Sequence, residues 1–214
     1  MPMSILRARD AEQKLLRKQS LLNAGWELFL AGDGQLPSVA QIVARAGLAK
    51  GTFYIYFKTK EELFLELVTQ AMDELFSKLM SYLQQDSISV AGCIDTFVNA
   101  VDREAPIIRL GPMVTGVLEK NTAPEILLQF KRRLHTNLQQ CGDRLGQCFP
   151  GLSNRKAART LLRSYAIILG VAQIQPSAHS PGAWEESELD DIRLSLQEDA
   201  RPIIELLWSQ ILHT

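Results

Sequence analysis

Apolar residues recur at intervals of three and four along almost the whole chain of 214 residues, which is the period of an amphipathic α-helix. No stretch alternates apolar and polar residues over the length of a strand between hairpin turns. The pattern therefore predicts an all-α fold. Pro202 either begins a helix or kinks one that starts earlier, and the pattern leaves both open. Glycine, proline and short polar stretches divide the chain into predicted helices at about residues 11–31, 38–46, 50–57, 59–84, 88–104, 106–120, 124–148, 154–174 and 189–212.

The first three predicted helices have the organisation of a helix-turn-helix head over residues 1–60, in which two short helices joined by a tight turn follow a supporting helix. Ser38 and Gln41 have the spacing of a capping box at the start of the second helix, and Gly47 ends it. Phe53 and Phe57 are four residues apart in the third helix, so we expect both in the core. Such a head can place a short helix in the major groove of DNA.

The other face of this third helix carries side chains suited to DNA. Lys50, Thr52 and Tyr54 offer base edges a charge, a hydroxyl with a methyl group, and a phenol. Gly51 has no side chain and lets the backbone approach a duplex closely. Residues placed to reach phosphates, or to bind an anion at a helix start, complete the predicted DNA-binding set: Tyr56, Lys60 and Ser38.

The charge is divided unevenly along the chain. Residues 1–60 hold nine lysines and arginines against four acidic residues, a net charge of +5. The remaining residues hold 14 basic and 20 acidic side chains, a net charge of −6. A basic head on an acidic body favours a protein that meets phosphates at one end only.

The segment from Ser38 to Leu63, SVAQIVARAGLAKGTFYIYFKTKEEL, resembles the helix-turn-helix signature of the tetracycline-repressor (TetR) family through the ordered string G-x-x-K-G-T-F-Y-x-Y-F-x-x-K-E-x-L. The resemblance implies a homodimer that represses by occupying a roughly palindromic double-stranded DNA operator and is released when a small-molecule effector binds the helical body. It also implies DNA contacts for Lys50, Gly51, Thr52, Tyr54, Tyr56 and Lys60. One departure is Ala49, where members often have a serine that caps the recognition helix.

Residues 61–214 are therefore expected to form a larger helical domain for ligand binding and dimerisation. Effector cavities in helical bundles lie between facing apolar helices and contain few polar groups. The candidate ligand-binding residues on this basis are Phe97, Arg109, Met113, Phe130, His135, Tyr165, Gln173 and Trp184. The last two helices are predicted to pair with those of a second chain as a four-helix interface, through Leu161, Leu162, Tyr165, Ile168, Ile204, Leu207 and Trp208.

Other classes of protein are not favoured by the sequence. Three cysteines without a C-x-x-C spacing argue against a disulfide framework or a zinc site, so we expect no metal and no cofactor. The longest apolar run, residues 165–172, is far shorter than the roughly 20 residues of a membrane span, and a cytoplasmic protein without membrane association is expected.

Catalytic signatures are also missing, because the sequence has neither G-x-S-x-G nor a phosphate-binding loop. We therefore expect a ligand-responsive transcriptional regulator and not an enzyme. Two alternatives stay open on the sequence alone. They are a helical interaction module that does not bind DNA, and an enzyme.

Overall fold

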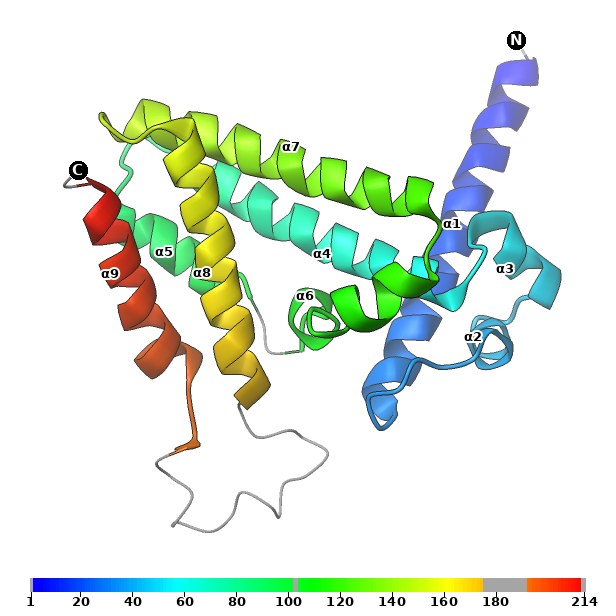
Figure 1. The fold of residues 1–214 in the computed structure, drawn as a ribbon. Coiled ribbons are helices and arrows are strands. Elements are labelled where there is room, and N and C mark those ends of the chain that lie inside the picture. Colours follow the sequence, from blue (N-terminus) through cyan, green and yellow to red (C-terminus); the bar gives the residue numbers. More distant parts are fainter. Residues whose placement is uncertain (1, 102–103, 175–191, 213–214) are drawn as a thin grey trace. The chain divides into compact units, whose positions relative to one another are not determined.

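The computed structural model describes residues 2–101, 104–174 and 192–212, with the side chains of residues 2–10 and 211–212 excepted. These residues form helices and contain no strand (Figure 1), which confirms the predicted all-α fold. The elements are α1 (Pro2–Ala31), α2 (Val39–Arg45), α3 (Lys50–Tyr56), α4 (Lys60–Tyr82), α5 (Val90–Asn99), α6 (Pro106–Arg109), η1 (Val114–Leu118), η2 (Glu119–Asn121), α7 (Pro124–Cys148), α8 (Asn154–Ile174), η5 (Leu196–Ala200) and α9 (Arg201–Leu212). The segments η1 and η5 are π-helical, and η2 is a 3₁₀ helix.

Most helix bounds agree with the apolar pattern, but the stretch from 106 to 120 does not form the single helix that was expected. It breaks after α6, at Gly111 and Pro112. A Cβ atom at Gly111 would lie 2.6 Å from the carbonyl oxygen of Ile107 and 2.8 Å from the Tyr165 hydroxyl, so the chain passes close to α8 here. Pro112 lacks the amide donor that a continuous helix needs. At the other end of the chain, Pro202 is the second residue of α9, but the π-helical segment η5 runs directly into α9, so Pro202 lies within a helical stretch that begins at Leu196.

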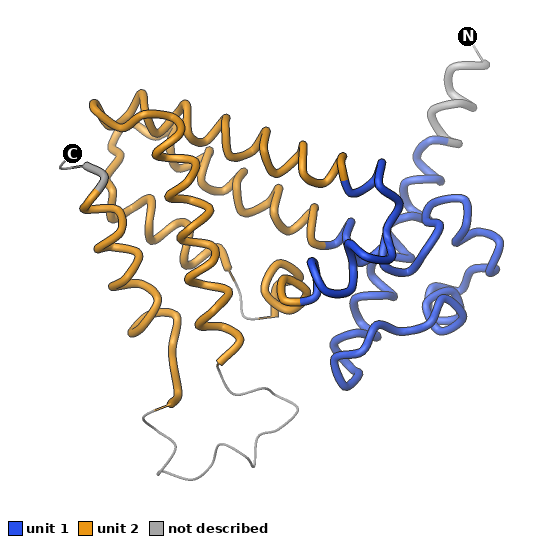
Figure 2. Tube along the Cα trace, in the orientation of Figure 1, with its two compact units in different colours: residues 1–67, 113–127 blue, residues 68–112, 128–214 orange. Residues whose placement is uncertain are grey.

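The described chain divides into two compact units (Figure 2), and each is considered by itself. Unit 1 comprises residues 1–67 and 113–127, and unit 2 comprises residues 68–112 and 128–214. Unit 1 thus contains the predicted head together with η1, η2 and the start of α7. The sequence pattern offers no sign of this association, because these residues lie far from the head along the chain.

The core of unit 1 is built where α1 and α4 approach closely. Gly25 lies at this contact, and a Cβ atom there would come within 2.9 Å of the Leu63 side chain. Phe29 and Phe64 pack beside it with ring centroids 5.8 Å apart. Each fully buried aliphatic or aromatic side chain contributes about 1.5–3 kcal/mol, so this contact holds the supporting helix of the head in place. The other core residues of the head include Leu21, Leu22, Ile42, Val43, Phe53 and Phe57.

The turn between α2 and α3 sets the direction of the third helix. Gly47 has φ of 66°, the left-handed conformation that favours glycine, and the Leu48 amide donates to the Val43 carbonyl at 2.9 Å. At the start of α2, the Ser38 hydroxyl accepts from the Gln41 amide and the Gln41 side chain accepts from the Ser38 amide. The predicted capping box is therefore present, and α2 has a fixed beginning and a fixed end.

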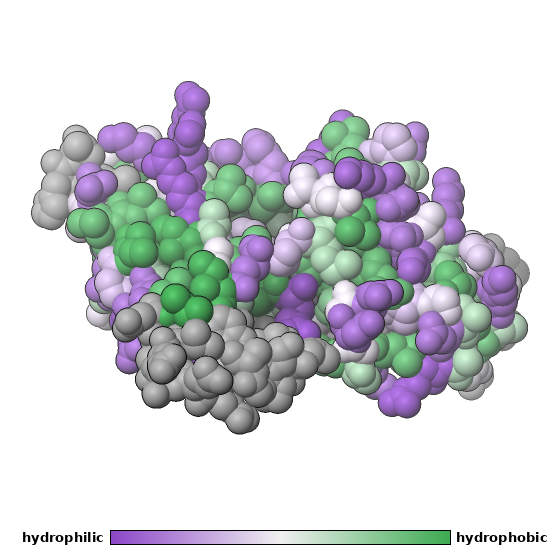
Figure 3. Space-filling model, turned by 60° about the horizontal axis from the view of Figure 1, so that its bottom comes forward, coloured by the Kyte–Doolittle hydropathy of each residue, from purple (hydrophilic) through white to green (hydrophobic). Residues whose placement is uncertain are grey.

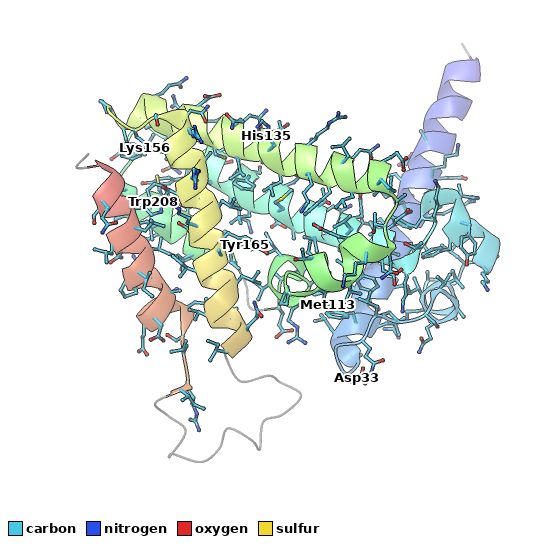
Figure 4. The ribbon with its side chains drawn as sticks, in the orientation of Figure 1. Asp33, Met113, His135, Lys156, Tyr165 and Trp208 are labelled. Carbon is cyan, nitrogen blue, oxygen red and sulfur yellow. The ribbon has the colours of Figure 1, made fainter. Side chains whose placement is uncertain are left out.

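Unit 2 contains two packed groups of helices. In the first, α4 and α7 run side by side (Figure 1), joined by a contact of Arg133 with Asp73 at 2.9 Å and by a hydrogen bond from Arg144 Nε to the Leu83 carbonyl at 2.8 Å. In the second, α9 packs on α5 and α8. Trp208 is buried there and its indole N–H donates to the Ser164 hydroxyl at 3.1 Å (Figure 4).

This buried hydrogen bond generates a test of the α8–α9 packing. Ser164→Ala should lower the free energy of unfolding by about 1–3 kcal/mol, because it leaves the Trp208 N–H without an acceptor in the core. The matched control is Ser81→Ala, since the Ser81 hydroxyl is exposed and donates to the Ser77 carbonyl at 2.9 Å. Urea unfolding of both variants measures the difference. Equal losses of stability in the two variants would contradict this account of the packing.

Candidate nucleic-acid interface

Helix α3 is anchored on the head by two phenylalanines. Phe53 is 0% exposed and Phe57 is 5% exposed, and their ring centroids lie 5.7 Å apart. The expected core positions of both residues are confirmed. Because α3 has only seven residues, this single apolar stripe determines which of its faces points outward.

The outward face of α3 carries three of the predicted DNA-contacting residues. Lys50 and Gly51 are exposed, and 52% of the Tyr54 side chain is accessible although its ring packs edge-on against Phe53 at 5.5 Å. A Cβ atom at Gly51 would meet no other atom within 4 Å. Nothing in the protein therefore requires a glycine at position 51, whereas a close approach by a duplex backbone would. Thr52 and Tyr56 are half-buried at the edges of this face.

Ser38 and Lys60 are already engaged within the head. The Ser38 hydroxyl takes part in the α2 capping box and also lies 2.8 Å from the Gln41 side-chain oxygen. The Lys60 ammonium donates to the Leu36 carbonyl at 3.0 Å, which ties the start of α4 to the loop before α2. Both residues thus help to position the head, and their contact with phosphate stays a prediction.

Sequence reasoning missed one residue of this surface. Ile55 is 69% exposed, although it is an apolar residue in the middle of α3. It lies two positions from both Phe53 and Phe57, which places it on the opposite side of a helix, so the helical period alone was sufficient to predict its exposure. A branched apolar side chain on a DNA-facing surface can contact the methyl group of thymine.

Several basic side chains of the head are not neutralised by the protein. Lys14, Arg17, Lys50 and Lys58 are exposed and form no ion pair with another described residue. By contrast, two other basic residues of the head are paired, Lys18 with Glu66 and Arg45 with Glu27. The positive charge left over belongs to α1, to α3 and to the residue after the C-cap of α3.

The residues predicted to bind an effector have different surroundings in the structure. Phe97 is buried against Phe76 with ring centroids 6.4 Å apart, and Arg109 lies 3.9 Å from Glu104. Met113 belongs to unit 1, whereas the other described candidates belong to unit 2. Phe130 is buried, Gln173 is exposed and donates to the Leu169 carbonyl, and Trp184 lies outside the described residues.

Tyr165 and His135 have more specific surroundings (Figure 4). The Tyr165 hydroxyl donates to the Ile107 carbonyl at 3.0 Å, and burial raises the pKa of Tyr165 to about 12. This tyrosine therefore joins α8 to α6 as a neutral donor. His135 is exposed on α7 and lines a cleft of about 400 Å³ between α7 and α8. Smaller cavities of about 310 Å³ and 300 Å³ lie between α4 and α7 and among α4, α5 and α6.

Four residues of the predicted dimer interface are buried inside one protomer: Leu161, Ile168, Ile204 and Trp208. They pack α8 and α9 within the chain, so they are not available at the surface of unit 2. Tyr165 and Leu207 are half-buried. Leu162 is 45% exposed, and neighbouring apolar residues that the prediction did not name are also exposed, at 49% for Ile174, 52% for Ile203 and 60% for Leu206.

The described residues were also compared with the requirements of a reactive thiol, a metal site and a membrane span. Cys93 and Cys141 are free thiols in the core, and burial raises the pKa of each to about 12, so both stay protonated and unreactive near neutral pH. Over the described part of the chain, no group of three metal-ligating side chains is present. None of the helices described is long and apolar enough to cross a membrane.

Comparison with known proteins identifies the family of this chain. The profile for "Bacterial regulatory proteins, tetR family" matches residues 21–67, which include α2 and α3. The profile described as "Tetracyclin repressor-like, C-terminal domain" matches residues 65–211, more than half of the chain. The chain belongs to the TetR family. Its two TetR profiles meet at residues 65–67, inside α4.

Individual relatives are more distant. The uncharacterized HTH-type transcriptional regulator YfiR of Bacillus subtilis is 26% identical over 102 residues, which are 45% of this chain and 50% of that protein. The fatty acid metabolism regulator protein of the same organism is 28% identical over 68 residues, 32% of this chain and 35% of that protein. The chain thus spans half or less of the length of these two relatives.

A solved structure shows the same fold over nearly the full length. The crystal structure of a transcriptional regulator from Rhodococcus sp. Rha1 has a TM-score of 0.60 to this chain at 16% sequence identity. The similarity covers 92% of this chain and 96% of that one. At this identity the comparison supports the TetR fold and nothing about the ligand.

The departure from the TetR signature at Ala49 generates a second test. Ala49 is the N-cap of α3 and provides no side-chain hydrogen bond. Ala49→Ser should raise the free energy of unfolding of the head by about 1 kcal/mol, because a hydroxyl there can accept from an amide of the first turn. Ala44→Ser is the control, since Ala44 is exposed inside α2 and serine is a weaker helix former there by up to about 0.7 kcal/mol. A change of the same sign in both variants would contradict the capping argument.

Proposed function

We propose that the protein is a ligand-responsive transcriptional repressor of the TetR family, which binds a palindromic DNA operator as a homodimer and is released by a small-molecule effector. The observation that carries this proposal is the surface of α3. Two buried phenylalanines fix the helix on the head, and Lys50, Gly51 and Tyr54 remain exposed. A surface of this kind fits the major groove of DNA.

The residues of α3 other than the buried Phe53 have proposed roles that follow from their exposure. Lys50 and Tyr54 contact base edges or phosphates, and Gly51 allows the backbone to come close to the duplex. Ile55 adds an apolar contact to a thymine methyl group. The half-buried residues Thr52 and Tyr56 contact DNA at the edge of the face, and Ser38 and Lys60 position the head beside the phosphates.

Binding should depend strongly on salt. Lys14, Arg17, Lys50 and Lys58 carry charge that no described acidic residue neutralises, so each is available to displace a cation from the duplex. Every such contact adds about −0.9 to the slope of the logarithm of the binding constant against the logarithm of the salt concentration.

The homodimer is proposed to form through a continuous apolar surface of α8 and α9. Ala166, Gly170 and Ile174 follow one another at intervals of four on α8, and all are exposed. On α9, Ile203 and Leu206 are also exposed. Figure 3 shows hydrophobic residues gathered over these two helices on the left of the view. An apolar surface of this kind is typical of a subunit interface.

The proposed dimer leads to a test on Gly170, which lies in the middle of this surface. A Cβ atom at Gly170 would meet nothing within 4 Å, so Gly170→Arg fits the isolated protomer. In the dimer it would bury a charge in the interface, and sedimentation should show mainly monomer at micromolar concentration, where the wild type is a dimer. Gly116→Arg is the matched control, because Gly116 is equally open but lies outside α8 and α9. Two variants with the same sedimentation behaviour would rule out this interface.

The DNA contacts are tested with a duplex that wild-type protein enriches from a random-sequence library. Lys50→Ala and Tyr54→Ala should each weaken binding of this duplex by about 1–3 kcal/mol, and Lys50→Ala should also make the salt slope shallower by about 1. Both side chains are exposed, so the melting temperature should change little.

Lys156→Ala is the control for these DNA measurements, since Lys156 is exposed on α8. It should bind the enriched duplex like the wild type. If no duplex is enriched even at low ionic strength, the chain is a helical interaction module that does not bind DNA. If all three variants bind like the wild type, α3 is not the contact surface.

A further inference from the structure

Helix α8 carries an unusual charge. It contains four basic residues and no acidic residue, and three of the four, Arg155, Arg159 and Arg163, follow one another at intervals of four. Residues at this spacing lie on one face of a helix. With a rise of about 1.5 Å per residue, the first and third arginines are about 12 Å apart along the axis.

These three arginines line the cleft between α7 and α8. The cleft has a volume of about 400 Å³, which is within the size range of small-molecule sites. Its apolar lining consists of Leu138, Ala158 and Leu162, and its remaining polar residues are His135 and Gln139. No acidic residue is among the lining residues. The cleft therefore combines an apolar surface with a row of positive charges.

The positive charges of this cleft are not compensated within the described protein. Arg155, Arg159 and Arg163 are exposed and form no ion pair with a described residue. Other arginines of unit 2 are paired, Arg133 with Asp73 and Arg201 with Glu205. Like charges in a row repel one another, and an anion bound among them removes that repulsion. Guanidinium groups also match carboxylates and phosphates in two-point hydrogen bonds.

We propose that this cleft binds an anionic amphiphile, whose phosphate or carboxylate group contacts the arginine row and whose apolar part covers Leu138, Ala158 and Leu162. The apolar lining argues against a DNA duplex, whose backbone offers no comparable apolar surface. The inference deepens the proposed function, on which it rests for its regulatory meaning, because the ligand of this cleft is the effector that the repressor requires.

Titration calorimetry with four probes below their micellar concentrations tests the ligand chemistry. Dodecyl phosphate and dodecanoate carry both features, inorganic phosphate carries the charge alone, and dodecyl maltoside carries the apolar chain alone. At least one of the first two should bind 10-fold or more tightly than either of the last two. Their order identifies phosphate or carboxylate as the preferred group. Equal binding of dodecyl maltoside and the charged amphiphiles would overturn the proposal.

A pair of charge reversals locates the site. Arg159→Glu should weaken binding of the tighter amphiphile at least 10-fold, because it reverses the central charge of the row. Arg132→Glu is the matched control, since Arg132 is exposed on α7 and does not line the cleft, and its affinity should stay within twofold of the wild type. Circular dichroism checks that both variants fold. An equal loss of affinity in the two variants would show a general charge effect and overturn the site.

Two further measurements separate this inference from the proposed function. The tighter amphiphile should release wild-type protein from the enriched duplex, and this release should be lost in Arg159→Glu. A wild type that binds the duplex but none of the amphiphiles overturns the cleft proposal and leaves the repressor intact. Sedimentation tests whether a second copy of the chain occupies the cleft instead. If Arg159→Glu shifts the monomer–dimer equilibrium without changing amphiphile binding, the cleft belongs to the contact between two copies and the amphiphile proposal is overturned.

Discussion

The burial of Phe53 and Phe57 is the interaction on which the proposed DNA-facing surface depends. A helix of seven residues is too short to be stable by itself in water, so α3 exists only because the head holds it. Phe53 in the helix and Phe57 at its C-cap bury one side of this segment, each contributing about 1.5–3 kcal/mol. The same geometry leaves Lys50, Gly51 and Tyr54 on the outside. Stability and the proposed DNA recognition therefore use different faces of one short helix.

The same division of faces applies to the body. In α8 and α9 large apolar side chains such as Leu161 and Trp208 pack inside the protomer. Other residues of the same helices, among them Ile174, Ile203 and Leu206, remain exposed and belong to the surface that we assign to the dimer. The outer side of α8 is thus basic in its first half, along the cleft with α7, and apolar towards its end.

The composition of unit 1 suggests how a ligand signal can reach the head. Residues 113–127 belong to the same compact unit as the helix-turn-helix, and the Thr59 hydroxyl donates to the Asn121 carbonyl at 3.1 Å. This segment includes the π-helical stretch η1, a backbone conformation that is frequent at functional sites. An effector changes operator affinity only if it binds two states of the protein unequally. Residues 113–127 come from the middle of the chain but pack with the head, so a change in their conformation is a physical route from a bound effector to the head.

Periodicity and local signals were sufficient to predict much of this structure. They predicted the all-α fold, the capping box at Ser38 and the burial of Phe53 and Phe57, because each depends on residues a few positions apart. They placed one helix over 106–120 although Gly111 and Pro112 interrupt it, and the close approach of Tyr165 at Gly111 comes from a distant helix that local signals do not include. They also selected Leu161 and Trp208 for the dimer interface, since apolarity alone does not distinguish a protomer core from a subunit contact. The contact roles of the α3 residues and the cleft on α8 depend on partners that the sequence does not contain.

The most direct test of the central claim is chemical protection of lysines by DNA. Amine acylation of the protein, read by mass spectrometry with and without the enriched duplex, compares Lys50 on α3 with Lys156 on α8, both of which are exposed in the free protein. The account predicts that the duplex protects Lys50 strongly and leaves Lys156 reactive. Equal modification of Lys50 in the presence and absence of bound duplex would contradict it.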